Sequence, residues 1–227
     1  MKKITRKQIL ELANKYNVKH VMSALSIVEI INSVYEVKSN IDEFILSKGH
    51  GYLALISILK NLGFNPKISE HPDRDDKNKI YCTTGSLGHG LPIAVGGALV
   101  NPNKMFYVLI SDAEVQAGTT WESLLIINKY NLNNIKIIID YNKSQLMGWI
   151  KDILPIEDLK TKLESFGCYV TYVDGHNEHL IKKELSLKSS KVHVIVANTI
   201  KGKGIKEKEN KPGYQIYIPK MDELYEK

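Results

Sequence analysis

The hydrophobic positions of this chain form two kinds of segment that follow one another in turn. A continuous apolar run of strand length, too short for a helix, occupies Met105–Ile110, and mostly apolar segments of similar length occupy Ile135–Ile139, Tyr169–Val173 and Val192–Ala197. The mixed segment Ile41–Leu46 is a fifth candidate strand. Segments with helical spacing or length lie at residues 5–16, Leu25–Tyr35, Gly51–Leu62, Leu91–Leu99, Asp158–Phe166 and Glu178–Leu187. This alternation predicts an α/β fold, a doubly wound and mostly parallel sheet with helices on both faces.

Capping residues locate several helix ends. Ser23 is expected to be the N-cap of the helix that begins near Leu25, and Gly63 is a normal C-cap residue. Thr119 is followed three residues later by Glu122, which is the capping-box pattern and predicts a helix from Thr119 to about Tyr130. The polar, proline-containing segment 65–79 is expected to be an exposed loop.

Composition excludes several classes of protein. The chain has 227 residues, 43% hydrophobic and 25% charged, as in an ordinary soluble globular protein. No apolar run approaches the ~20 residues that span a membrane, and the N-terminus lacks a signal-peptide pattern, so we expect a cytoplasmic protein. The net charge is +6, but the lysines are scattered apart from a cluster at 201–211, so no nucleic-acid partner is expected. We expect one domain over residues 1–227, with a partly mobile Lys-, Gly- and Pro-rich tail from about 200.

The stretch Met105–Gly148 predicts a site. Its two apolar runs flank one helix, so they should be parallel, buried strands of a βαβ unit. Asp112 and Asn142 then follow the carboxyl ends of these strands, where open α/β sheets bind ligands. A carboxylate and an amide oxygen suit Mg²⁺, which takes further ligands from water and substrate phosphates. The pattern therefore indicates a magnesium ion and a phosphorylated ligand.

Several motifs around this site resemble one enzyme family. Ser111-Asp112-Ala113 with the distant Asn142 resembles the Gly-Asp-Gly…Asn diphosphate motif of thiamine-diphosphate enzymes. Further matches, in order, are Leu46-Ser47-Lys48-Gly49-His50, His71-Pro72, Thr83-Thr84-Gly85-Ser86-Leu87-Gly88-His89-Gly90, Asp174-Gly175-His176-Asn177 and Lys201-Gly202-Lys203-Gly204. Over about residues 10 to 210 the chain resembles the N-terminal, diphosphate-binding half of the transketolase family.

The resemblance implies cofactors and roles. The cofactors would be thiamine diphosphate and Mg²⁺, with Ca²⁺ or Mn²⁺ as substitutes for the metal. The metal ligands would be Asp112, Asn142 and the carbonyl of Ser144. Contacts with the cofactor would come from His50, Gly85, Ser86, Leu87, Ser111, Asp112, Ala113, Glu114, Asn142 and Leu146. His20 and His71 would contact the substrate, and Glu122 is either a third catalytic residue or a capping acid.

Departures from the family pattern leave the reaction open. Ala117 stands where most transketolases have a glutamate, and Gln215 stands in place of a histidine. The sequence around His20 is more similar to deoxyxylulose phosphate synthase, a decarboxylating relative. The leading interpretation is two-carbon ketol transfer on a sugar or 2-oxo acid; the alternatives are a decarboxylating synthase subunit, or a degenerate, non-catalytic assembly subunit. A nicotinamide-binding Rossmann protein is disfavoured, because no G-x-G-x-x-G follows the first strand.

The resemblance also implies a partner. Members of the family need a glutamate from a pyrimidine-binding domain, which in full-length relatives follows in the same chain. This sequence stops at Lys227, so we expect that domain on a separate C-terminal subunit, in a dimer of heterodimers. The apolar segments Leu91–Leu99 and Trp121–Ile127 are candidates for its docking surface.

Overall fold

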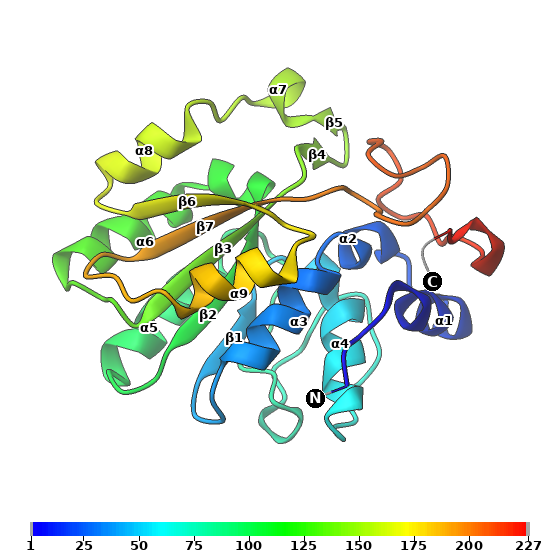
Figure 1. Cartoon of the computed structure of the whole chain (residues 1–227), viewed down its shortest axis with the longest axis horizontal. Coiled ribbons are helices and arrows are strands. Elements are labelled where there is room, and N and C mark those ends of the chain that lie inside the picture. Colours follow the sequence, from blue (N-terminus) through cyan, green and yellow to red (C-terminus); the bar gives the residue numbers. More distant parts are fainter. Residues whose placement is uncertain (1, 226–227) are drawn as a thin grey trace.

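A five-stranded parallel sheet forms the centre of the protein in a computed structural model that describes residues 2–225 (Figure 1). The strand order is β1-β2-β3-β7-β6, with each neighbouring pair parallel. The strands are β1 (Glu43–Leu46), β2 (Phe106–Ser111), β3 (Ile135–Tyr141), β6 (Tyr169–Asp174) and β7 (His193–Asn198). The five predicted strand segments therefore all form strands, and the predicted βαβ unit is confirmed by the pairing of β2 with β3.

Helices cover both faces of this sheet, as expected for a doubly wound fold. One face carries α1 (Arg6–Tyr16), α2 (Val21–Leu25), α3 (Val28–Val37), α4 (Tyr52–Asn61) and α9 (Glu178–Ser186). The other carries α5 (Gly90–Val100), α6 (Gly118–Lys129) and α8 (Leu159–Ser165). A small hairpin, β4 (Ser144–Gln145) and β5 (Gly148–Trp149), leads into α7 (Ile150–Ile153) at the carboxyl edge of the sheet, and the sequence patterns did not predict it. Short 3-10 turns lie at Gly49–Gly51, Asp76–Asn78, Asp112–Gln116 and Met221–Glu223.

Two hydrophobic cores, one on each face of the sheet, explain why the central strands are mostly apolar. Successive strand residues point to opposite faces, so Leu109 and Ile138 pack with the first set of helices while Val108 and Ile137 pack with the second. Because neither face of β2 or β3 meets water, a mostly apolar run is needed instead of an alternating one.

The start of α6 differs from the prediction. The helix begins at Gly118 with Ala117 as N-cap, and Thr119 lies inside its first turn. The Thr119 hydroxyl donates to the carbonyl of Gly88 at 2.7 Å, so it ties α6 to a neighbouring loop instead of capping its own helix. The predicted capping box with Glu122 is therefore wrong.

The helix expected from Leu25 is interrupted near its start. Ser23 lies within the short helix α2, and α3 begins only at Val28, with Ile27 as its N-cap. The Ser23 carbonyl accepts a hydrogen bond from the Ser26 hydroxyl at 2.9 Å. Ser23 is therefore not the N-cap of the helix predicted at Leu25.

The Lys-, Gly- and Pro-rich segment after Thr199 packs against the rest of the chain. The Gly202 amide donates to the carbonyl of Met22 at 3.0 Å, and Ile205 is fully buried. Gly202 has a φ of 68°, and a Cβ there would lie 2.1 Å from the end of the Met22 side chain, so a larger residue would be strained and would have to displace Met22. Within residues 2–225, the helices are all too short or too polar to cross a membrane.

Candidate active site

The carboxyl ends of β2 and β3 bring the predicted metal ligands together. Ser111 is in register with Asp140, so Asp112 and Asn142 leave the sheet on adjacent strands. The Asp112 carboxylate accepts a hydrogen bond from the Lys143 amide at 2.6 Å, immediately after Asn142. Both side chains are almost completely buried. Asp112 and Asn142, which are far apart along the chain, thus lie at the ends of two neighbouring strands that contact each other.

The oxygen atoms at this edge fit a divalent cation. The Asn142 amide nitrogen donates to Asp140 at 2.9 Å, which orients its oxygen towards the Ser144 amide, 3.1 Å away. Burial and the negative charge of Asp140 raise the pKa of Asp112 to about 7, and a bound cation would offset both effects. Within residues 2–225, no three or more His, Cys, Asp or Glu side chains are grouped to hold a metal. An ion here would therefore use Asp112, the Asn142 amide and backbone oxygens, with a phosphate supplying further ligands, as Mg²⁺ does.

Asp140 is the buried centre of the site. Its carboxylate accepts hydrogen bonds from the Ser26 hydroxyl at 2.9 Å, the Lys48 ammonium and the Thr199 hydroxyl. The Lys48 and Asp140 side chains are both fully buried. Although burial opposes ionisation, the Lys48 charge and these hydrogen bonds hold the pKa of Asp140 below its usual range. Asp140 is therefore ionised, and it anchors the predicted metal ligand Asn142 through a hydrogen bond.

Cationic and neutral nitrogen groups lie beside these carboxylates. Lys201 is 4% exposed, and burial together with the neighbouring charge of Lys48 lowers its pKa to about 8. Burial and the charges of Lys48 and Lys201 also lower the pKa of His50 well below its usual value, so its imidazole is neutral at pH 7. An anionic ligand at this edge would raise the pKa of Lys201 again and so favour its protonated form. Both lysines stand within the family motifs, but the sequence patterns predicted no role for either.

The predicted substrate residues also come together. The ring centroids of His20 and His71 are 5.1 Å apart, and those of His20 and His50 are 6.2 Å apart. Gly85 has a φ of 139°, and a Cβ there would lie 3.1 Å from the His71 ring. Histidines from three separate loops therefore form one cluster, His20/His50/His71, against the glycine-rich loop.

Glu114 fastens three of the motifs to one another. Its carboxylate accepts hydrogen bonds from the Ser47 hydroxyl, the Gly88 amide at 3.0 Å and the Ser111 amide at 2.8 Å. With Ser111 it forms the capping box of the turn that starts at Asp112. Glu114 is fully buried by these contacts and holds the loops together, while its contact with the cofactor stays a prediction.

The comparisons with known proteins agree with this geometry. The family model for the transketolase thiamine diphosphate binding domain matches residues 14–215. This chain belongs to the transketolase family. It is 35% identical to an apulose-4-phosphate transketolase subunit of Actinobacillus succinogenes, covering 98% of this chain and 91% of that protein. It is 34% identical to the 6-deoxy-6-sulfo-D-fructose transketolase subunit SqwG of a Clostridium species, covering 92% and 86% of the two chains.

Solved transketolases share the fold. The transketolase of Leishmania mexicana superimposes with a TM-score of 0.85 at 21% sequence identity, covering 92% of this chain. The R525L mutant of the Pichia stipitis enzyme gives the same TM-score at 22% identity, covering 96%. This chain spans only 37% and 38% of those two chains. The fold prediction, a thiamine-diphosphate-binding α/β domain, is thereby confirmed.

Other residues that the family resemblance singled out lie at the surface. Ser86 and Leu87 are exposed in the loop that also holds Gly85, and Leu146 is 59% exposed on the β4–β5 hairpin. Glu122 is exposed on α6, outside the buried cluster around Asp140. These side chains are therefore open to a ligand or to another protein chain.

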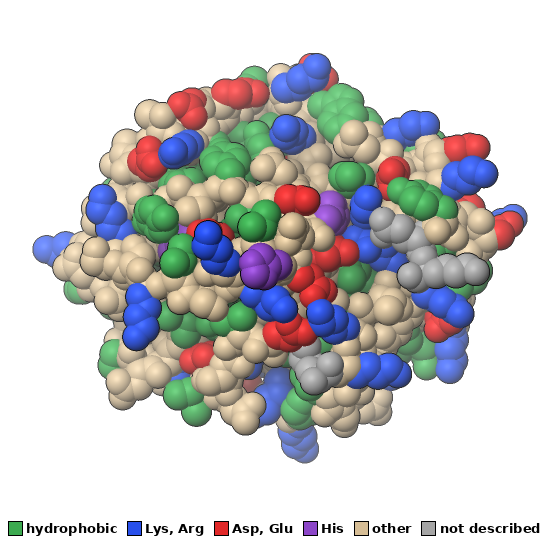
Figure 2. Space-filling view, viewed as in Figure 1, with side chains coloured by type: hydrophobic (Ala, Val, Ile, Leu, Met, Phe, Trp, Pro, Cys, Tyr) green, Lys and Arg blue, Asp and Glu red, His purple; other side chains and the backbone are tan. Residues whose placement is uncertain are grey.

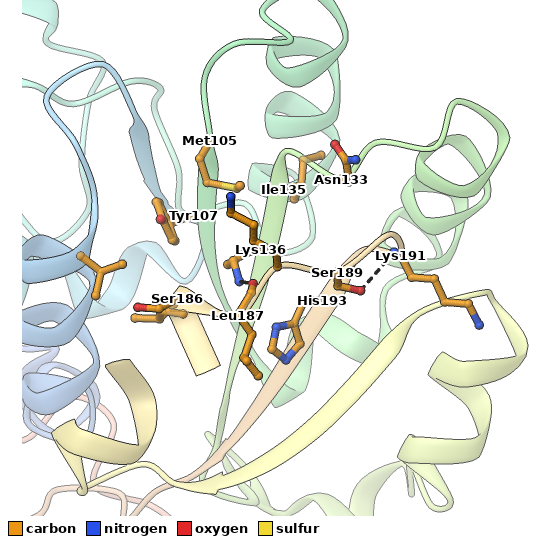
Figure 3. A pocket seen from close by; sticks show the side chains of 13 residues that line it. Met105, Tyr107, Asn133, Ile135, Lys136, Ser186, Leu187, Ser189, Lys191 and His193 are labelled. Atoms are coloured by element: carbon orange, nitrogen blue, oxygen red, sulfur yellow. Dashed lines mark hydrogen bonds between the residues drawn. The ribbon is translucent and has the colours of Figure 1, made fainter. Parts of the chain in front are cut away.

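A hollow at the opposite edge of the sheet is separate from the transketolase-type site. This hollow has a volume of about 450 Å³. Tyr107, Lys136 and His193 line it from the amino-terminal parts of β2, β3 and β7 (Figure 3). The Lys136 ammonium donates to the carbonyls of Glu184 and Leu187, 3.2 and 2.5 Å away. Lys136 thus satisfies carbonyls at the C-terminal end of α9, a structural task. A second hollow of about 670 Å³ lies beside β1, and neither contains a predicted site residue.

Proposed function

We propose that this chain is the thiamine-diphosphate-binding subunit of a two-chain, transketolase-type enzyme that transfers a two-carbon ketol unit between sugars. The observation that supports it most is that side-chain oxygens able to bind a metal lie beside buried lysines at one sheet edge. Asp112 and Asn142 follow neighbouring strands, and the charge of Lys201 interacts with that of Asp112. A metal-bound diphosphate would satisfy both kinds of group.

In this proposal each part of the site has one task. Mg²⁺ would be held by Asp112, Asn142 and the carbonyl of Ser144, and the diphosphate by His50 and Lys201. The open loop from Gly85 to Leu87 would contact the ring system. When bound, thiamine diphosphate would supply the carbon nucleophile for breaking a bond next to a carbonyl. The residues of this chain would bind and orient the cofactor and the substrate, and they would exclude water from the site.

The substrate side belongs to the histidine cluster. His20 and His71 lie on the accessible side of the site and would bind substrate hydroxyl or carbonyl groups. The names of two relatives specify sugars that carry a phosphate or a sulfonate. We therefore propose an anionic sugar as the substrate of this chain too.

The partner would cover the outer faces of α5 and α6. Exposed apolar side chains on these two helices are Ile93, Leu99, Val100, Leu125 and Ile126, with exposed fractions between 39% and 75%. The two helices pack on each other, so these side chains extend over one continuous pair of elements. Apolar groups gathered in this way are typical of a protein interface. Because three relatives are named as subunits of transketolases, the occupant that we propose is a second subunit with a pyrimidine-binding domain.

The docking surface has a direct test. Ile126→Asp places a charge within the proposed contact and should weaken the complex at least tenfold in an analytical ultracentrifugation or interferometry titration. Leu180→Asp on α9 is the matched control, since Leu180 is 37% exposed on the opposite face. Equal affinity of the two variants would show that the partner binds elsewhere.

Cofactor binding is tested by thermal shift. With thiamine diphosphate and Mg²⁺ at about 100 times Kd, the Tm should rise by about 5–10 °C, because a ligand of the native state adds about 2.7 kcal/mol. Asp112→Ala should abolish this rise, and Asp222→Ala at an exposed position should retain it. An unchanged shift in Asp112→Ala would refute the metal assignment. A wild-type chain without any shift would indicate a non-catalytic subunit.

A further inference from the structure

Glu70 links two loops of the active site that are far apart in the sequence. Its carboxylate oxygens accept hydrogen bonds from the Lys19 amide at 3.0 and 3.1 Å, and one of them accepts from the His20 amide at 3.3 Å. Lys19 and His20 belong to the connection between α1 and α2. Glu70 belongs to the long connection between α4 and α5. One side chain therefore holds the backbone of one loop on the other.

The two joined loops carry the paired histidines. His71 follows Glu70 directly, and its carbonyl accepts a hydrogen bond from the Ser69 hydroxyl at 2.7 Å. Anchoring Lys19 and His20 on Glu70 brings the His20 ring within 5.1 Å of the His71 ring. The separation of the two rings thus depends on a contact made by neither ring.

Apart from this anchor on its backbone, His20 has a hydrogen bond between its ring and the backbone of Gln215. The Nδ1 atom of His20 is buried, and no hydrogen-bond partner for it lies among residues 2–225. His20 is also the N-cap residue of α2, but its side chain makes no capping hydrogen bond. The backbone anchor at Glu70 is therefore a main restraint on where this ring lies.

We propose that Glu70 is a positioning residue that holds His20 against His71 at the substrate side of the site and sets the electrostatic surroundings of His20. The catalytic part of this role rests on the proposed function, since it assumes that His20 contacts substrate. The structural and electrostatic parts do not need a cofactor or substrate.

The charges around His20 predict the direction in which its pKa changes when the Glu70 charge is removed. Burial lowers the pKa of His20, and the charges of His71 and Lys201 lower it further. The Glu70 carboxylate acts in the opposite direction and raises it, as does a backbone contact with Gln215. The uncharged ring of His50 lies 6.2 Å away. Removing the Glu70 charge must therefore make His20 harder to protonate.

The test is a histidine titration of the full chain by NMR. The chain has seven histidines, and the His20 ring signal is assigned from its loss in His20→Gln. Glu70→Gln removes the charge but keeps an oxygen acceptor, and Glu70→Ala removes both. Glu11→Gln is the matched control, because it removes the same charge from an exposed position on α1.

The expected result is a His20 titration midpoint at lower pH in Glu70→Gln than in the wild type, with no change in Glu11→Gln. In Glu70→Ala the nuclear Overhauser contacts between the His20 and His71 rings should weaken or vanish, and the Tm should fall by a few degrees. An unchanged or higher midpoint in Glu70→Gln would overturn the proposal. So would an intact His20–His71 contact in folded Glu70→Ala. Neither result depends on the cofactor thermal shift, so the two proposals can fail separately.

Discussion

The buried ion pair beside the predicted metal ligands gives a strong stability prediction. Lys48 and Asp140 are both fully buried, and Asp140 also accepts hydrogen bonds from Ser26, Asn142 and Thr199. Asp140→Asn keeps the shape of the side chain but leaves the Lys48 charge without its partner. Removing one member of a buried pair costs about 3–5 kcal/mol of unfolding free energy. For a chain of this length, that corresponds to a Tm lowered by roughly 6–20 °C.

Urea unfolding of the full chain measures this cost. The set is Asp140→Asn, Lys48→Met and the double variant, and the double variant should cost clearly less than the sum of the two singles. The control is Glu164→Gln, which breaks an exposed pair with Lys160 and should change stability by about 0.5 kcal/mol or less. A cost below about 1 kcal/mol for Asp140→Asn, with additive singles, would mean that the pair is not coupled in the folded protein.

Three further predictions concern pH, packing and substrate choice. Burial and the charge of Lys136 lower the pKa of His193 from 6.5 to about 4. Between these two pH values His193 is protonated in the unfolded chain but not in the folded one, so stability falls as the pH drops from about 6.5 to 4. Unfolding titrations should show His193→Gln losing on the order of 3 kcal/mol of this pH dependence, and an equal slope in both proteins would contradict the shift. Gly90→Ala should cost about 1–3 kcal/mol in thermal melts, because its Cβ would lie 2.5 Å from the Ser47 side chain; a neutral effect would disprove that close contact. Ala117 and Gln215 stand where the family pattern has a glutamate and a histidine. The complete enzyme should therefore turn over xylulose and ribose phosphates about a hundredfold more slowly than its own substrates. Robust formation of sedoheptulose phosphate would show this prediction to be wrong.

Much of the fold could be predicted from local patterns. The buried strands required mostly apolar runs, and such runs can be read from sequence because few polar side chains interrupt them, as Lys136 does in β3. Helix starts were harder, because a capping pattern does not show which backbone amide a side chain will meet. Thr119 has the right sequence for a cap, yet it bonds to Gly88, a contact between residues far apart in sequence.

The arrangement of the candidate site could be predicted in part for the same reason. Asp112 and Asn142 follow recognisable strands, so their proximity follows from topology. The roles of Lys48, Lys201 and Glu70 depend on which loops meet at the sheet edge, and spacing along the chain does not contain that information. The one signal that the sequence offers for such residues is a charged side chain within or beside a motif of small residues.

That no nucleic acid binds this chain stays a prediction from the scattered lysines of its sequence. Figure 2 shows lysine and arginine side chains scattered among acidic ones over the face in view, rather than gathered in one patch. A net charge of +6 distributed in this way gives no basic stripe on that face for a phosphate backbone.

Carbon–carbon transfer measured with separated subunits tests the central claim most directly. The chain is purified alone and together with the product of an adjacent gene, and both samples are assayed at equal concentration with thiamine diphosphate and Mg²⁺. We predict no transfer by the chain alone and transfer by a stable complex that loses activity in Asp112→Ala. Full activity of the isolated chain would contradict the account of a two-chain enzyme.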